Sequence, residues 1–168
     1  MTVATGLELN QTLRFDKLTL TQQQSFNSRP TPVLVRLPGG THLYKWTQYP
    51  LINNRGFASE YWSSWQPMTV EAMRIPGFSE LRKRYRNRDG EVGRPQEFMR
   101  ARNAVTDYWN NMESITKAEL RLPVWGFIGV CAPQPVSKSE EQSRRVLFIG
   151  GEYQLVLPNM QAQHIFKL

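Results

Sequence analysis

The pattern of apolar and polar positions predicts β-strands in two parts of the chain. The run VLVRL (33–37) predicts a strand, LPGG predicts a turn, and THLYKWTQ (41–48) predicts a second strand in which apolar and polar residues alternate. A short strand is expected within GFASEYWSSWQP. Further strand-like runs follow in the last third of the chain: KAELRL, VWGFIGVCA, RRVLFIG, EYQLVLP and AQHIFKL. The Gly-Gly pair between the third and fourth of these runs is typical of a hairpin.

The middle of the chain carries a helical period instead. Apolar residues recur along one face of 94–113 at the spacing of an α-helix: Phe98, Ala101, Val105, Tyr108 and Met112. Shorter helices are predicted over 68–75 and 79–86. Strands followed by helices and then by more strands favour the α+β class.

Two prolines divide the chain into two parts. Residues 1–32 are rich in Thr and Gln and end at Pro30 and Pro32, so we interpret them as a loosely ordered leader. Residues 33–168 are interpreted as a single catalytic-type domain, long enough to bury a core of its own.

The net charge and the cysteine content limit the binding partners and the cellular compartment that we expect. The 168-residue chain carries a net charge of +7, so its surface attracts anions such as phosphorylated ligands, nucleic acid, acidic proteins or an anionic membrane. The single cysteine, Cys131, excludes an internal disulfide and indicates a reducing compartment. Neither a signal-peptide pattern nor a run of about 18 apolar residues is present. We expect a cytoplasmic site of action, no membrane span, and a signal-independent route if the protein is secreted.

Several common catalytic sites lack their motifs. The sequence has no Gly-rich phosphate loop, no G-x-G-x-x-G after a strand and no G-x-S-x-G elbow. Two histidines and one cysteine do not form a metal-binding pattern, so no metal is expected. Cys131 lies in an apolar run, where burial would raise its pKa and suppress nucleophilic reactivity.

Three segments combine polar, aromatic and small residues in a way that suits a ligand site. They are LPGGTHLYKWTQ, RGFASEYWSSW and GGEYQLVLP. The plainer interpretation is that their aromatic side chains pack in the core, with Tyr153 on the face opposite Gln154. On that interpretation His42 and His164 are surface histidines.

The three segments resemble the ADP-ribosyltransferase-like superfamily, whose members bind NAD without a Rossmann fold. LYKW is similar to the family's LYRG strand, GFASEYWSS to its GFxSTS strand, and GEYQLVLP to its GExExLLP strand, in the same order. Lys45 stands where Arg is usual, and Gln154 where transferases carry Glu. The short gap between the first two segments and the IGGEYQ stretch resemble toxin-type NAD glycohydrolases. Over roughly residues 33–168, the resemblance implies an α+β core of two small packed antiparallel sheets with two or three helices.

The same resemblance implies a toxin or effector that consumes NAD as its substrate by cleaving the nicotinamide–ribose bond. The outcome is hydrolysis or ADP-ribosyl transfer to a macromolecule. Such cleavage needs a cation for the diphosphate, aromatic faces for the nicotinamide and a polar group near the ribose. The candidate catalytic residues are Gln154, Glu152, Tyr44 and Ser59. The candidate NAD-binding residues are Arg36, Lys45, Arg55, Phe57, Trp62 and Trp65.

A cluster of cations in RKRYRNR predicts a second surface. Its members are Arg82, Lys83, Arg84, Arg86 and Arg88. Such a cluster suits a nucleic-acid backbone or an acidic immunity or inhibitor protein, and equally a solvated helix. Two alternatives therefore stay open. One is a non-enzymatic nucleic-acid-binding module that uses the 82–102 surface, and the other is a protein-interaction domain.

Overall fold

A computed structural model describes residues 7–47, 49–63, 114–135, 147–148, 150–151 and 153–168. Two short helices open this part of the chain: the 3-10 helix η1 (Phe15–Lys17) and the α-helix α1 (Leu20–Gln24). The strands are β1 (Val33–Leu37), β2 (His42–Thr47), β3 (Tyr61–Ser63), β4 (Ser114–Leu120), β5 (Val124–Val130), β6 (Gln134–Pro135), β7 (Leu147–Phe148), β8 (Tyr153–Val156) and β9 (Ile165–Lys167). A second 3-10 helix, η2 (Ala162–His164), leads directly into β9.

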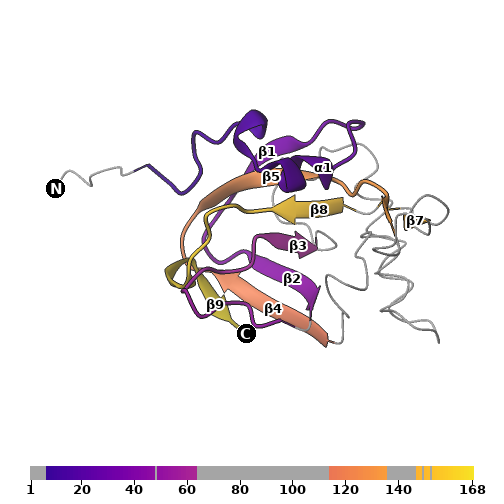
Figure 1. The fold of residues 1–168 in the computed structure, drawn as a ribbon. Coiled ribbons are helices and arrows are strands. Elements are labelled where there is room, and N and C mark those ends of the chain that lie inside the picture. Colours follow the sequence, from indigo (N-terminus) through magenta and orange to yellow (C-terminus); the bar gives the residue numbers. More distant parts are fainter. Residues whose placement is uncertain (1–6, 48, 64–113, 136–146, 149, 152) are drawn as a thin grey trace.

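The main feature is one seven-stranded antiparallel sheet with the order β1-β5-β8-β3-β2-β4-β9 (Figure 1). Strand β8 comes from near the end of the chain and pairs with both β5 and β3. It therefore joins early and late strands into a continuous sheet. Strands β6 and β7 form a separate two-stranded sheet.

This architecture corrects the predicted fold class. We expected an α+β, ADP-ribosyltransferase-like core of two small packed antiparallel sheets with two or three helices. The described residues instead form mostly one sheet, are 12% helical and contain no helix of seven or more residues. The prediction fails because β8 bridges what would have been two sheets. The helices predicted over 68–75, 79–86 and 94–113 lie outside the described residues.

The sheet is strongly curled, as its short connections require. Strands β4 and β5 are joined by residues 121–123 only, although three strands lie between them in the sheet. In a flat sheet they would stand roughly 19 Å apart, whereas the chain from Leu120 to Val124 spans roughly 14 Å at most. Strand β5 accordingly bends toward β4 (Figure 1). The loop between β1 and β2 is held against β4, where Leu120 N donates to Thr41 O at 2.9 Å.

The inner face of the curled sheet buries the main hydrophobic core. We define this face by Val35, Ile128, Leu155, Trp62 and Leu43, which come from five neighbouring strands and are all buried. Side chains on the inner face alternate along each strand with those on the opposite, outer face.

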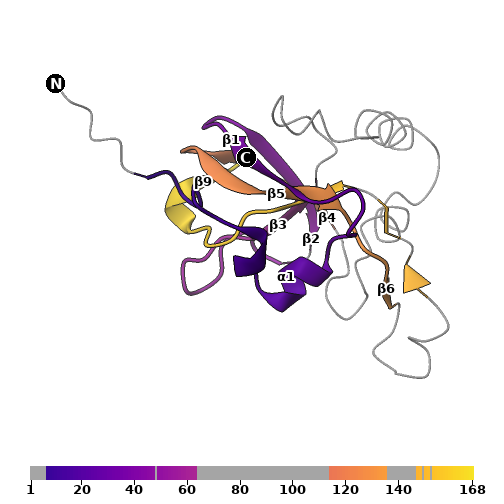
Figure 2. The ribbon, with the colours of Figure 1, turned by 90° about the horizontal axis from the view of Figure 1, so that it is seen from above.

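The outer face of β1, β5, β8 and β3 is covered by the N-terminal segment, which we define as residues 7–32 (Figure 2). Leu18 and Phe26 from this segment pack on Phe127 and Val156 of β5 and β8. Of residues 1–32, interpreted above as a loosely ordered leader, 7–32 are described and lie against the sheet. No helix in the described ranges is long and apolar enough to cross a membrane.

The Gly-Gly pair does not close the expected hairpin. Strand β7 pairs with β6, whereas β8 pairs with β5 and β3. Gly150 and Gly151 have φ angles of 64° and 87°, and Gly151 N donates to Cys131 O at 3.0 Å. A Cβ atom on Gly150 would come within 3.0 Å of the Ala132 carbonyl. The pair therefore lets the chain pass tightly over the end of β5, in a conformation that residues with a side chain rarely adopt.

Candidate functional site

The three segments singled out in the sequence contribute adjacent strands. They supply β2, β3 and β8, which are consecutive in the sheet. Tyr44 lies opposite Ser63, and Ser63 lies opposite Gln154. Directly opposed residues share a face. Tyr44, Ser63 and Gln154 therefore form a row across three strands, here called the outer-face row.

Gln154 in this row serves a structural contact. Its side chain is 9% exposed, and Nε2 donates to both the carbonyl oxygen and the Oγ of Ser25, each at 2.8 Å. Tyr44 is half-buried, and the Lys117 ammonium lies 5.6 Å from its ring centroid. The amide of Gln154 thus binds the N-terminal segment. Glu152, predicted to share this face, lies outside the described residues.

A second group of predicted residues meets on the opposite face. Lys45 follows Tyr44 in β2 and therefore faces inward, where its Nζ donates to Ser59 Oγ and lies 5.8 Å from the centroid of the Trp62 ring. Among the described residues no carboxylate pairs with Lys45. Burial lowers the pKa of this amine to about 8, since the charged form loses hydration in apolar surroundings. Lys45 as a whole is half-buried, so it keeps some contact with solvent.

The backbone around Ser59 fixes the position of its hydroxyl. Ser59 N donates to Leu51 O at 2.8 Å, and Trp62 Nε1 donates to Ser59 O at 2.9 Å. The preceding residue is also held, because Ala58 N donates to Met160 O at 2.9 Å. Ser59 is thus placed by three separate parts of the fold. We call Lys45 and Ser59 the Lys45–Ser59 pair.

Trp62 packs in the core. It is 2% exposed, and its indole N–H is satisfied by Ser59 O. Its contribution to the site is an apolar, electron-rich wall beside the Lys45 ammonium. Trp65, predicted to bind with it, lies outside the described residues.

Other candidate residues lie elsewhere. Arg36 binds both carboxylate oxygens of Glu8, at 2.6 and 2.8 Å, and three strands separate it from β2. Trp125 Nε1 also donates to Glu8, and these contacts hold the pKa of Glu8 below its usual value, with Arg36 as the main cause. Arg36 thus anchors the N-terminal segment.

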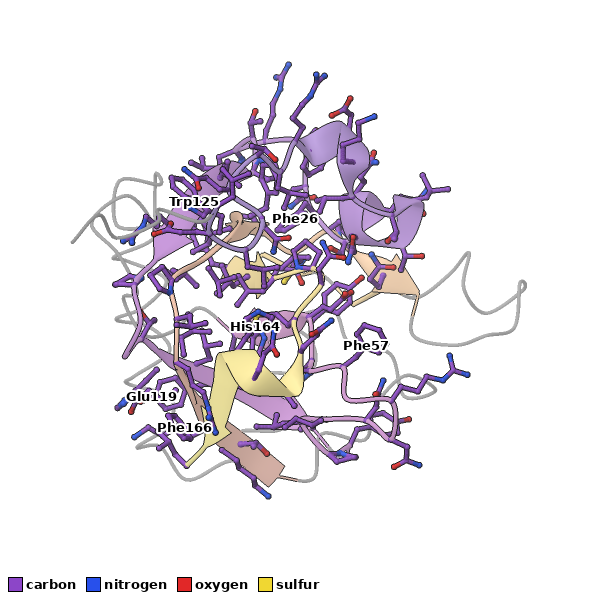
Figure 3. The ribbon with its side chains drawn as sticks, turned by 90° about the vertical axis from the view of Figure 1, so that its left-hand side faces the viewer. Phe26, Phe57, Glu119, Trp125, His164 and Phe166 are labelled. Atoms are coloured by element: carbon purple, nitrogen blue, oxygen red, sulfur yellow. The ribbon has the colours of Figure 1, made fainter. Side chains whose placement is uncertain are left out.

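Arg55 and Phe57 lie on an exposed loop. Phe57 is 48% exposed and forms a backbone bridge with Gln161, beside η2 (Figure 3). The loop is shaped by Asn53, whose Oδ1 accepts from the backbone N–H groups of both Arg55 and Phe57. Neither side chain belongs to the Lys45–Ser59 pair. Arg82, Lys83, Arg84, Arg86 and Arg88 lie outside the described residues.

Sequence reasoning missed two polar contacts. Glu60 accepts a hydrogen bond from Gln22 Nε2 at 2.8 Å and another from Asn159 N at 3.2 Å. His164, expected at the surface, is 8% exposed, and its Nδ1 accepts from Gln161 N at 2.9 Å. The Glu60 contacts join segments that are distant in sequence, and the His164 contact caps the 3-10 helix η2. Neither contact produces a periodic pattern in the sequence.

Neither metal-ligand geometry nor similarity to known proteins assigns the Lys45–Ser59 pair to a known class of functional site. Within the part of the chain that the structure describes, no three His, Cys, Asp or Glu residues group in a way that could hold a metal ion. Comparison with protein-family models, with curated proteins and with solved structures finds no match to this chain.

Proposed function

We propose that this protein binds NAD and cleaves its nicotinamide–ribose bond, with the Lys45–Ser59 pair as the anion-binding element. The observation that carries the proposal is the meeting of three segments, distant in sequence, as consecutive strands β2, β3 and β8. Each segment was singled out for its resemblance to an NAD-binding motif. Their adjacency supports a shared site.

The electrostatics of Lys45 favour an anionic ligand. A half-buried ammonium with only a neutral hydroxyl partner among the described residues has lost hydration without gaining a counter-charge. A phosphate oxygen would supply that counter-charge and form a charge-assisted hydrogen bond. Ser59 Oγ already accepts from Lys45, so its hydroxyl hydrogen would point to the same anion.

The proposal assigns different roles to the two faces. Lys45 and Ser59 contact the ligand on the inner side, whereas Tyr44 and Gln154 lie in the outer-face row. Gln154 Nε2 donates hydrogen bonds to the carbonyl oxygen and the Oγ of Ser25, so we assign Gln154 a positioning role: it holds β8 against the N-terminal segment. We propose either hydrolysis of NAD or transfer of its ADP-ribose as the outcome of the reaction. We also propose a cytoplasmic site of action and an acidic inhibitor protein as a partner.

Release of nicotinamide from NAD by the purified protein tests this function. We expect Lys45→Met to abolish release and Ser59→Ala to reduce it. We also expect Lys45→Met to weaken NAD binding at least tenfold in calorimetry, about the contribution of one charged hydrogen bond. The matched control is Lys117→Met, which removes a cation of the neighbouring strand from the outer face.

Two results would overturn the proposal. One is the absence of both nicotinamide release and NAD binding in the folded wild-type protein. The other is release that survives in Lys45→Met at the wild-type rate, which would leave the Lys45–Ser59 pair without a role. Label from NAD on a macromolecule, rather than free ADP-ribose, would identify transfer as the reaction.

A further inference from the structure

Lys45 lies on the inner face of the sheet, where most of the side chains are apolar. It lies opposite Thr116 in β4 on one side and next to Trp62 of β3 on the other. The same inner row continues through Leu155 and Ile128, both fully buried. The amine therefore projects into the hydrophobic side of the sheet, and among the described residues Ser59 Oγ is its one hydrogen-bonding partner.

Other described lysines have different surroundings. Lys17 and Lys167 are exposed, and Lys117 lies over the Tyr44 ring on the outer face. None of them projects into the main core or has a serine hydroxyl as a hydrogen-bonding partner. Lys45 is thus chemically distinct within the described chain.

We infer that the Lys45 amine is a nucleophile that condenses with the open-chain aldehyde of an aldose, with Ser59 relaying the proton. ADP-ribose is the aldose that cleavage of NAD would supply, and to that extent the inference rests on the proposed function. The reactivity of the amine itself does not depend on NAD. A role in anion binding needs only the charge of Lys45, whereas this role needs its nitrogen lone pair.

The fraction of neutral amine supports this chemistry. Because burial lowers the pKa of Lys45 to about 8, roughly a quarter of the molecules carry a neutral amine at pH 7.5. An ordinary lysine is almost entirely protonated at that pH and is a poor nucleophile. Desolvation in an apolar pocket is one of the known ways to activate a lysine for imine formation.

The reaction balances without any further reagent. The Nζ lone pair attacks the carbonyl carbon, and the carbonyl π electrons move to oxygen, which takes a proton from the Ser59 hydroxyl. Nζ then returns a proton to Ser59, which leaves a neutral carbinolamine. The hydroxyl group then leaves as water with the remaining Nζ proton, relayed by Ser59, while the Nζ electron pair forms the C=N bond of the imine. Addition of water reverses every step. One amine and one aldehyde thus give one imine and one water molecule.

Reductive trapping tests the inference on the full-length protein. The protein is incubated at pH 7.5 with glyceraldehyde or with ADP-ribose in the presence of sodium cyanoborohydride, and labelled lysines are mapped by mass spectrometry. We expect Lys45 to be labelled at least tenfold faster than Lys117 and Lys17 with both probes. Ser59→Ala should slow labelling of residue 45 several-fold while leaving labelling of Lys17 unchanged.

A charge-preserving variant separates the two roles of this residue. Lys45→Arg keeps a cation but forms no reducible imine, so we expect it to lose the label and to bind NAD more tightly than Lys45→Met does. If Lys45→Arg does not fold, the distribution of label over the lysines of the wild-type protein decides the question. Labelling that follows solvent exposure alone, or an unlabelled Lys45, would overturn the inference.

Failure of the proposed NAD cleavage and failure of the nucleophile hypothesis give different experimental results. Selective labelling by glyceraldehyde without nicotinamide release would leave the reactive amine in place and reject NAD as substrate. Nicotinamide release without any label at Lys45 would retain the proposed function and reject the nucleophile.

Discussion

Lys45 is the residue whose chemistry conflicts most with its surroundings. In the strand HLYKWT, strict alternation places Leu43, Lys45 and Thr47 on one face, and that face is the apolar inner one. The charge therefore opposes folding, since an ammonium in this position has lost water and gained only a hydroxyl. Residues kept at such a cost are often functional, which is why Lys45 is central to both proposals.

Replacing Lys45 by methionine should stabilise the fold near neutral pH. The shift of the pKa of Lys45 from 10.5 to about 8 means that the buried charge opposes folding by about 3 kcal/mol. Methionine removes this cost but also removes the hydrogen bond to Ser59, which stabilises the wild-type protein by about 1 kcal/mol. We expect a net gain of about 2 kcal/mol at pH 7, measured by urea denaturation.

The pH dependence identifies the cause of that gain. Well below pH 8 the amine is protonated in both the folded and the unfolded state, so the full cost opposes folding. As the pH rises from about 8 to 10.5 the folded protein releases its proton first and the cost disappears. The stability difference between Lys45→Met and wild type should therefore shrink over this range. A difference that stays constant to pH 10.5 would contradict the burial of a charge.

Gly126 marks a close approach of two strands. A Cβ atom there would lie 2.5 Å from the Val156 carbonyl oxygen and would also collide with the Leu157 side chain. Because a backbone atom cannot easily move away, Gly126→Ala should destabilise the fold by about 2 to 4 kcal/mol. Thermal denaturation measures this, with Leu122→Ala at a 53% exposed position as a near-neutral control. Equal melting temperatures for the two variants would show that β5 and β8 are farther apart.

At the scale of elements, the N-terminal segment acts as a cover that is fixed at several points. Glu8 binds Arg36, Gln22 binds Glu60, and Ser25 binds Gln154. Its helix α1 has a complete capping box, in which the Thr19 hydroxyl accepts from Gln22 N and the Gln22 side chain accepts from Thr19 N. Five helical residues are too few to be stable alone. The sheet therefore stabilises α1, and Leu18 and Phe26 on either side of α1 bury part of the outer face.

Gln154→Glu should loosen this cover. The amide donates two hydrogen bonds to Ser25, and a carboxylate has no hydrogen to donate and would repel the Ser25 carbonyl. We expect a loss of about 1 to 3 kcal/mol in denaturation and faster proteolysis within residues 7–32.

Gln11→Glu is the matched control for that substitution. Gln11 uses its Oε1 as an acceptor for Glu8 N, and a glutamate keeps that acceptor. If both glutamate variants were equally stable, Gln154 would not be a donor to Ser25.

At the scale of the whole molecule, the curled sheet has a protected centre and exposed ends. Strands β5 and β8 each pair with two neighbours, while β9 pairs only with β4 among the described strands. Beside that end of the sheet Glu119 and Phe166 lie next to each other near the surface (Figure 3). Stability should therefore fall from the middle of the sheet toward β9.

Hydrogen exchange of the backbone amides measures this gradient. We expect the slowest exchange in 126–130 and 153–156, and exchange at least tenfold faster in β9. Uniform protection across the sheet would indicate that another part of the chain covers the β9 edge.

The sequence by itself determined where many strands lie and which residues alternate along them. The strand-like runs at β1, β2, β5 and β8 are strands in the structure, and the predicted burial of Cys131 and Tyr153 is confirmed. Local periodicity has this power because side chains of an extended chain must point to alternate faces.

Only the tertiary structure decided which strands pair and which face is buried. The insertion of β8 between β5 and β3 replaced two predicted sheets by one. The packing of the N-terminal segment gave Gln154, a candidate catalytic residue, the role of a hydrogen-bond donor to Ser25. Strand pairing and face coverage depend on contacts between residues far apart in the chain. A local pattern is the same whichever partner covers it, so the surroundings of Lys45 became visible only in the folded sheet.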